Sequence, residues 1–180
     1  MSFREFDISI NKNDKEIKSK GTDMAEVLNL IGKDWMLISS GNEEKFNMMT
    51  ASWGGLGVLW NKNVTFSFIR PQRYTIDFIE SNDYYALSFY DKRYRESLNY
   101  CGKFSGRDVD KMKESKLTPV FDSSTVYFAE ASLVLICKKI YEQQMDPECF
   151  IDKGLETNYP QKDYHKVFIG EIEKVLVNEN

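Results

Sequence analysis

The sequence predicts a mainly β protein, a β-barrel with peripheral helices. Its strand-like segments alternate apolar and polar residues and are separated mostly by turns, with three short helical segments inserted between them. No G-x-G-x-x-G motif follows a strand, so a doubly wound nicotinamide-binding sheet is not indicated. The chain has 180 residues and no shift in composition that would mark a linker, so one domain spanning residues 1–180 is expected.

The first third of the chain begins with a polar segment and continues into a helix and a hairpin. Residues 1–20 are polar and rich in lysine, and are expected to form an edge strand or a loosely held arm without a function. Residues 23–31 combine a capping-box pair with helical apolar spacing, and Gly32 ends the predicted helix. The next expected elements are a strand at 35–40, a polar turn at 41–45 and a returning segment at 47–53.

A second strand is predicted at residues 64–69, where apolar and small polar residues alternate. Pro71 fixes a turn after it, and Thr75 is predicted to be the N-cap of a short helix with an apolar face. The remaining expected elements are a strand at 84–90, a helix at 94–100, a polar loop at 105–111, a charged helix ending near 116, a long bent strand at 125–141, a loop at 146–163 and a closing strand at 165–177.

The end of the strand at 64–69 brings two arginines and a hydroxyl to one place. Arg70, Arg73 and Thr75 are grouped there beside the predicted helix start. Guanidinium groups and free helix-start N–H groups are donors that suit a phosphate. The alternative is that both arginines are solvated and lie over Tyr74 or Trp60.

Several motifs in order along the chain carry a resemblance to a known family. They are N-x-M-T-A-S-W at 47–53, R-P-x-R-Y-T at 70–75, the loop at 105–111, His165 and the Gly-Glu-Ile of 170–172. Together they resemble the flavin reductase-like family that includes flavoredoxin. The resemblance covers most of the chain and implies an FMN-binding split β-barrel.

The resemblance also implies where FMN would bind. Met49 to Ser52 correspond to the family segment beside the isoalloxazine edge, and Trp53, Met48 and Met49 are candidates for an apolar wall. Thr and Ser on a strand can equally face water, and Met or Trp can belong to the core. The predicted cofactor-binding residues are Asn47, Met49, Thr50, Ala51, Ser52, Trp53, Arg70, Arg73, Tyr74 and Thr75. The glycines at 54, 55 and 57 are interpreted as backbone relief that lets a flat ring approach closely.

Candidates for chemistry outside the cofactor are fewer. His165, the single histidine, is a catalytic candidate because the resemblance implies a place near the active-site mouth; a hydrogen-bonded histidine at a strand start is the alternative. Arg107, Asp108 and Lys111 are predicted to line an opening for a substrate or electron donor. Asp108 and Asp110 can instead be helix N-caps.

Composition excludes other classes of function. The three cysteines are scattered without a C-x-x-C pair, and with one histidine no metal site is expected. Cys137 is predicted to be buried, whereas Cys101 and Cys149 could be exposed. The net charge is −4 without long blocks of one sign, so nucleic acid is not an expected partner. No signal peptide or membrane span is indicated, and a cytoplasmic protein is expected.

The predicted function is that of an FMN-binding oxidoreductase, either a flavin reductase or a flavoredoxin-like electron carrier. One alternative is a non-catalytic FMN-binding protein for storage or sensing, and another is an empty barrel whose groove binds protein. The expected partners are NAD(P)H or a small electron-transfer protein. A homodimer is expected from the resemblance and from aromatic residues that one barrel would leave exposed, namely Tyr84, Tyr85, Phe89, Tyr90 and Phe128.

Overall fold

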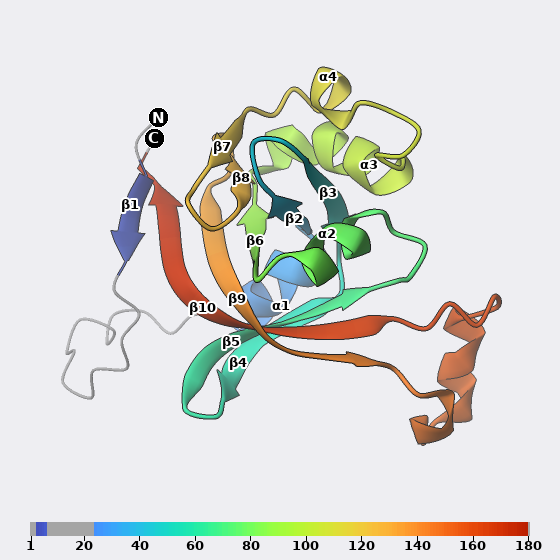
Figure 1. The fold of residues 1–180 in the computed structure, drawn as a ribbon. Coiled ribbons are helices and arrows are strands. Elements are labelled where there is room, and N and C mark those ends of the chain that lie inside the picture. Colours follow the sequence, from blue (N-terminus) through green and yellow to red (C-terminus); the bar gives the residue numbers. More distant parts are fainter. Residues whose placement is uncertain (1–2, 7–23, 180) are drawn as a thin grey trace.

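The computed structural model describes residues 3–6 and 24–179, and these form a mainly β protein (Figure 1). The strands are β1 (Phe3–Phe6), β2 (Met36–Gly41), β3 (Phe46–Ala51), β4 (Gly54–Leu59), β5 (Lys62–Ile69), β6 (Tyr84–Phe89), β7 (Pro119–Phe121), β8 (Val126–Phe128), β9 (Leu133–Gln144) and β10 (Lys166–Asn178). The helices are α1 (Met24–Gly32), α2 (Thr75–Ser81), η2 (Lys92–Tyr94), α3 (Arg95–Lys103), α4 (Lys111–Ser115), η3 (Pro147–Cys149) and η4 (Lys153–Asn158).

One curved antiparallel sheet dominates the fold. Its strand order is β3-β2-β6-β9-β10-β5-β4, and β1 pairs with β10 off this path. The two end strands, β3 and β4, are consecutive in the chain and are joined by residues 52–53 alone. The sheet must therefore curl until its two edges meet at this link, which makes a barrel that is open along the seam between β3 and β4.

Strands β9 and β10 form the long central ribbon of the sheet. They pair from Leu133–Val177 to Gln144–Lys166, and two register shifts bend the ribbon. Beyond Lys138, β9 has no pairing with β6, and the ribbon extends away from the barrel (Figure 1). At its end the chain makes an excursion through residues 145–165, with η3 and η4, before it returns into β10.

Side chains on opposite faces of the sheet belong to different apolar clusters. Met49 packs inside the barrel with Ile38, Leu87 and Phe168, whereas Met48, on the opposite face of β3, packs with Leu98 of α3. This alternation is the period-2 pattern of a strand buried on both faces. Met48 therefore faces away from the position that a cofactor wall would require.

Several elements differ from those predicted by sequence. Residues 54–59, for which no element was predicted, form strand β4. The long strand expected at 125–141 is two strands, β8 and β9, separated by a turn at residues 129–132. β7, which pairs with β8, was not predicted. Helix α3 continues to Lys103, beyond the predicted end at residue 100. The predicted helix at 23–31 and the strand at 165–177 are confirmed where the structure describes them, although Asp23 lies outside the described residues.

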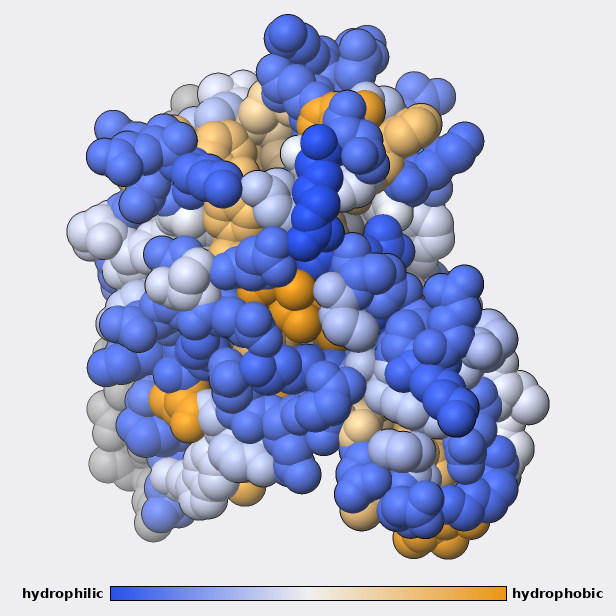
Figure 2. Space-filling model, turned by 45° about the vertical axis from the view of Figure 1, so that its right-hand side comes forward, coloured by the Kyte–Doolittle hydropathy of each residue, from blue (hydrophilic) through white to orange (hydrophobic). Residues whose placement is uncertain are grey.

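The aromatic residues expected to be left over for a dimer are mostly buried in the single chain. Tyr85, Phe89, Tyr90 and Phe128 are buried, and Tyr84 is half-buried. The exposed apolar side chains lie elsewhere, notably on β4 and its turn at Val58 and Trp60. Figure 2 shows one face of the molecule, which is largely hydrophilic with small, separate apolar patches. None of the helices in the described part is long and apolar enough to cross a membrane.

Candidate functional site

A cavity of about 460 Å³ opens where the sheet edges meet. Its walls come from the end of β3 and the link to β4, the end of β5, the start of α2, the loop at 103–106 and the start of β10. All ten residues predicted to bind a cofactor line it, together with Lys111 and His165. The cavity therefore gathers residues that are up to 118 positions apart in the chain, from Asn47 to His165.

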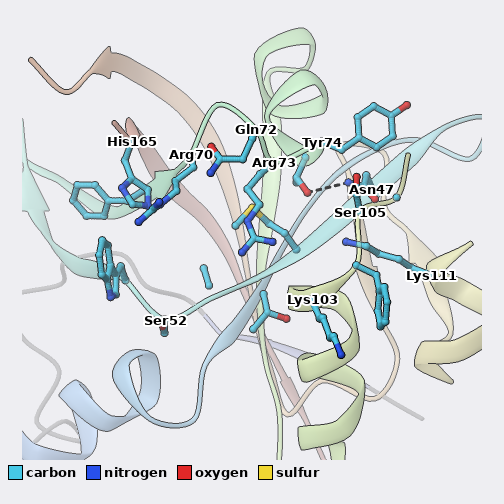
Figure 3. A pocket seen from close by; sticks show the side chains of 18 residues that line it. Asn47, Ser52, Arg70, Gln72, Arg73, Tyr74, Lys103, Ser105, Lys111 and His165 are labelled. Carbon is cyan, nitrogen blue, oxygen red and sulfur yellow. Dashed lines mark hydrogen bonds between the residues drawn. The ribbon is translucent and has the colours of Figure 1, made fainter. Parts of the chain in front are cut away.

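The two ends of the cavity differ in chemistry (Figure 3). Arg70 and His165 lie toward one end, and Asn47, Ser105 and Lys111 lie toward the other, with Arg73 between them. Trp53 and Phe68 also line the cavity and contact the His165 ring, with ring centroids 5.1 Å and 6.5 Å from it. The end at His165 thus combines aromatic rings with Arg70, and the other end combines polar and basic side chains with the ring of Tyr74.

Lys111 occupies the basic end as a buried residue, not at an exposed opening as predicted. Its side chain is anchored by hydrogen bonds from Nζ to the carbonyl oxygens of Met48 and Cys101, at 2.7 and 2.9 Å. Burial lowers the pKa of Lys111 to about 8. A lysine that begins a short charged helix is expected to be exposed. This amine is buried because the helix packs against α3 and the amine reaches a carbonyl oxygen of β3.

Arg73 lies beside Lys111 and is half-buried. Its Nη1 donates to the carbonyl oxygen of Gly102 at 2.6 Å. Burial, and then the charge of Arg70, lower the Arg73 pKa. Neither Arg73 nor Lys111 forms an ion pair with any residue that the structure describes. Two cations that share a partly dry cavity without a carboxylate create a site for an anion.

Arg70 lines the cavity, but its side chain already has partners. Its guanidinium forms an ion pair with Asp163 at 2.6 Å and donates to the carbonyl oxygen of Asn158 at 2.9 Å. Gln72 donates to the same Asp163 oxygen at 2.6 Å. Arg70 therefore ties the excursion at 145–165 to the cavity, and Asp163 neutralises its charge.

Thr75 and Asn47 are bonded to each other. Asn47 Nδ2 donates to Thr75 Oγ1 at 3.0 Å, and both residues are buried (Figure 3). Thr75 is the first residue of α2 and Tyr74 takes the N-cap position, so the predicted N-cap is displaced by one residue. The amide oxygen of Asn47 lies against Gly106, where any Cβ would collide with it. Gly106 thus lets the loop close onto this end of the cavity.

The middle of the cavity is formed by the end of β3. Thr50 donates its hydroxyl hydrogen to the carbonyl oxygen of Leu98, which ties β3 to α3. Ala51 and Ser52 follow, and Trp53 is 46% exposed at the rim. The small residues leave this stretch of backbone accessible from the cavity.

His165 is buried at the aromatic end. Its Nδ1 lies 2.9 Å from the hydroxyl of Tyr159, so it is both hydrogen-bonded, as the alternative interpretation expected, and part of the cavity wall. Desolvation, followed by the charge of Arg70, lowers its pKa to about 4. The imidazole is therefore neutral at ordinary pH.

Two predicted residues of the donor opening do not line the cavity. Arg107 stacks on Tyr74, with its guanidinium carbon 4.4 Å from the ring centroid, and pairs with Asp77 at 2.8 Å. Asp108 is exposed. Asp110 is the N-cap of α4 and accepts a hydrogen bond from the Met112 amide, as one interpretation predicted.

Four lining residues outside the predicted set and outside the recognised loop at 105–111 were missed, namely Phe68, Gln72, Lys103 and Phe104. Phe68 was predicted as part of a strand. Because side chains alternate along a strand, its place next to the buried Ile69 was the signal that it faces the other side of the sheet. Lys103 and Phe104 carried no motif. They reach the cavity only because α3 packs against β3.

Metal and thiol chemistry find no support in the described residues. No group of three or more His, Cys, Asp or Glu that could hold a metal ion is present in residues 3–6 and 24–179. Cys137 is buried as predicted, and Cys101 is also buried, contrary to one expectation. Desolvation raises the pKa of Cys101 to about 11. Cys149 is exposed.

Solved structures with a similar fold include several flavoproteins. Flavoredoxin from Methanosarcina acetivorans has a TM-score of 0.65 and 20% identity, covering 81% of this chain and 69% of that one. Flavoredoxin of Desulfovibrio vulgaris (Miyazaki F) has a TM-score of 0.63 and 24% identity over the same shares. The NADH:FAD oxidoreductase of Streptomyces globisporus C-1027 has a TM-score of 0.60 and 13% identity, covering 81% of this chain and 75% of that one.

The TM-scores establish a shared split-barrel fold, and identities this low leave the reaction open. No curated protein matches the chain in sequence. Residues 29–180, however, match the family described as the flavin reductase like domain. This match includes every residue of the cavity. The chain belongs to the flavin reductase-like family.

Proposed function

We propose that the cavity binds FMN and that the protein is a flavin-dependent oxidoreductase, either a flavin reductase or a flavoredoxin-like electron carrier. The observation that carries the proposal is a pair of cations without a carboxylate partner among the described residues, Lys111 at one end of the cavity and Arg73 in its middle, facing an end that Trp53 and Phe68 line. FMN combines a phosphate with a flat ring system, and the two ends match these two parts. Ligand cavities of several hundred Å³ are usual for such molecules.

The residues present fit this cofactor. Arg73 and Lys111 would hold the phosphate, with Ser105 and the backbone of Gly106 beside it. Backbone and small side chains of Ala51 and Ser52 would face the ring edge. When bound, the flavin supplies hydride and electron transfer, and the protein supplies position and polarity.

Arg70 is proposed to anchor the excursion at 145–165 to the cavity and not to bind the phosphate. Its charge is already paired with Asp163, so it contributes less to holding a second anion. FMN is preferred over FAD in this proposal because the cavity supplies one basic end. FAD remains a direct competitor to measure, since an FAD-dependent enzyme shares the fold.

The electron donor is proposed to be NAD(P)H or a small electron-transfer protein. Arg107 is occupied by Asp77 and Tyr74, so it does not offer a free charge to a dinucleotide. Transient nicotinamide binding would have to use the open rim near Trp53 and Lys103. A homodimer and a cytoplasmic location are part of the same proposal.

The test is the visible spectrum of the protein as purified, followed by anaerobic additions. A bound flavin is expected, and NADH, NADPH or a reduced iron–sulfur protein should bleach it. Bound flavin that none of the three donors reduces would favour storage or sensing. Protein that neither carries a flavin nor takes up added FMN would overturn the proposal.

A further inference from the structure

Tyr159 lies in the excursion between β9 and β10, outside the cavity lining and outside every motif recognised in the sequence. It is 6% exposed. Its ring packs against Tyr164 and Phe150, with centroids 4.9 and 5.9 Å away. The Arg70 guanidinium lies over the same ring, 5.2 Å from its centroid. A ring held by three neighbours places its hydroxyl group in a fixed position.

That hydroxyl group reaches the buried imidazole of His165. Tyr159 Oη is 2.9 Å from Nδ1 and 3.8 Å from the sulfur of Met145. An unprotonated imidazole nitrogen is a much stronger acceptor than a thioether sulfur. The phenol hydrogen therefore belongs on the bond to Nδ1. A neutral imidazole that accepts at Nδ1 carries its own proton on Nε2.

We propose that Tyr159 is a positioning residue that fixes His165 as the Nε2–H tautomer, so that the cavity presents one neutral N–H donor to its ligand. His165 lines the cavity, and within the described part of the chain its Nε2 makes no hydrogen bond. An N–H group that faces the cavity without a protein partner is free to donate to a ligand acceptor at this end.

Burial, and then the charges around the imidazole, keep it neutral. Arg70 from the end of β5 and Arg73 beyond it disfavour the imidazolium, whereas Asp163 favours it. Asp163 is held by Arg70 and Gln72, and the remaining rings in contact with His165, those of Trp53 and Phe68, are uncharged. The donor is therefore available without a change of charge across ordinary pH.

As a statement about a flavin site, the inference rests on the proposed function. The chemical class of acceptor it selects is a carbonyl oxygen or ring nitrogen, which the flavin ring carries at its edge. A phosphate is disfavoured at this end, because a neutral imidazole adds no positive charge and Arg70 is already paired.

The single histidine of the chain makes the test direct. Protein labelled with ¹⁵N-histidine gives one imidazole, and its two-bond couplings to the ring protons identify the protonated nitrogen. In the ligand-free protein at pH 7 the proton is expected on Nε2. Tyr159→Phe keeps the ring but removes the phenol hydrogen, so the tautomer ratio should fall by about fivefold or more.

Tyr164→Phe is the matched control. It removes a hydroxyl group from the same aromatic cluster, and this hydroxyl group is not the one that is hydrogen-bonded to His165. It should leave the ¹⁵N chemical shifts of both imidazole nitrogens unchanged. A proton on Nδ1 in the wild type would overturn the inference. So would equal spectra for the wild type and Tyr159→Phe.

Adding FMN separates this inference from the proposed function. If FMN binds, the Nε2 shift of the wild type should move and its proton should exchange more slowly. Binding of FMN without any change at Nε2 would refute the donor role. Failure of FMN to bind would refute the proposed function, while the tautomer of the ligand-free protein would still decide the role of Tyr159.

Discussion

Two residues define the chemistry of the cavity, and only one of them was placed correctly from the sequence. The arginine in the R-P-x-R-Y-T motif, Arg73, points at the cavity as expected. Lys111 was expected on an exposed loop, because a lysine at the start of a short charged helix usually faces water. Its burial depends on two carbonyl oxygens, from Met48 and Cys101, that are brought together only by tertiary packing.

Replacing Lys111 tests its role as a phosphate ligand. Lys111→Met keeps the length of the side chain and removes the charge, so FMN affinity should fall at least tenfold, since a hydrogen bond to a charged group contributes about 1.5–3 kcal/mol. Riboflavin affinity should change little. Arg107→Met is the matched control, because Arg107 is paired with Asp77 outside the cavity. Titrations of the ligand-free variants measure all four affinities.

The low pKa of Lys111 predicts a pH dependence. Burial lowers its pKa to about 8 in the ligand-free protein, and a bound phosphate would raise it by favouring the charged form. FMN affinity should therefore be constant between about pH 7, where the FMN phosphate is fully ionised, and about pH 8, and should fall as pH rises further, because the free protein loses the proton that binding requires. A parallel fall for riboflavin over this range would contradict the assignment.

At the scale of elements, the strands with strong alternation were predictable, and β5 was one of them. Strand β4, which pairs with β5 in a hairpin, was not predictable. Gly54, Gly55 and Gly57 argue against a strand by propensity. In the structure, Gly55 and Gly57 nevertheless lie in a strand that pairs with β5, beside the ring of Phe66. The turn uses Trp60 and Asn61 with positive φ values of 52° and 59°, a conformation suited to a two-residue hairpin but uncommon for tryptophan.

The bend in β10 depends on another glycine. Gly170 lies at a register shift between β9 and β10, where a Cβ would collide with the Tyr85 hydroxyl and lie 2.8 Å from Cys137 Cβ. Gly170→Ala should lower the free energy of unfolding by about 1–3 kcal/mol, as overpacking does. Gly32→Ala is the control, since no atom lies within 4 Å of a Cβ there. Chemical denaturation should give Gly32→Ala a free energy of unfolding close to that of the wild type.

At the scale of the whole molecule, the predicted barrel with peripheral helices is confirmed, and the argument offered for a dimer is weakened. The pattern of alternation reports which faces are buried, but it does not report whether one chain or two bury them. The aromatic residues counted for an interface fill this chain's own core. Several exposed apolar residues lie on the β4 hairpin, among them Val58 and Trp60, and Ile151 lies on the excursion.

A homodimer stays a prediction, and its interface is now expected at the exposed apolar residues of the β4 hairpin and the excursion. Light scattering at micromolar concentration should give about twice the chain mass of 21.0 kDa. Trp60→Lys should reduce that mass toward the monomer if the β4 hairpin contributes to the interface. Leu28→Lys, on the exposed surface of α1, is the comparison and should leave the mass unchanged. A monomer with flavin bound would refute the dimer.

The central claim is that the basic end of the cavity holds a phosphate, and the comparison of FMN with riboflavin tests it most directly. Both share the ring, and only FMN presents an anion to Arg73 and Lys111. Titration of the ligand-free protein should find FMN bound at least tenfold more tightly, with Arg73→Ala removing most of the difference. Equal affinities for the two ligands would contradict the account.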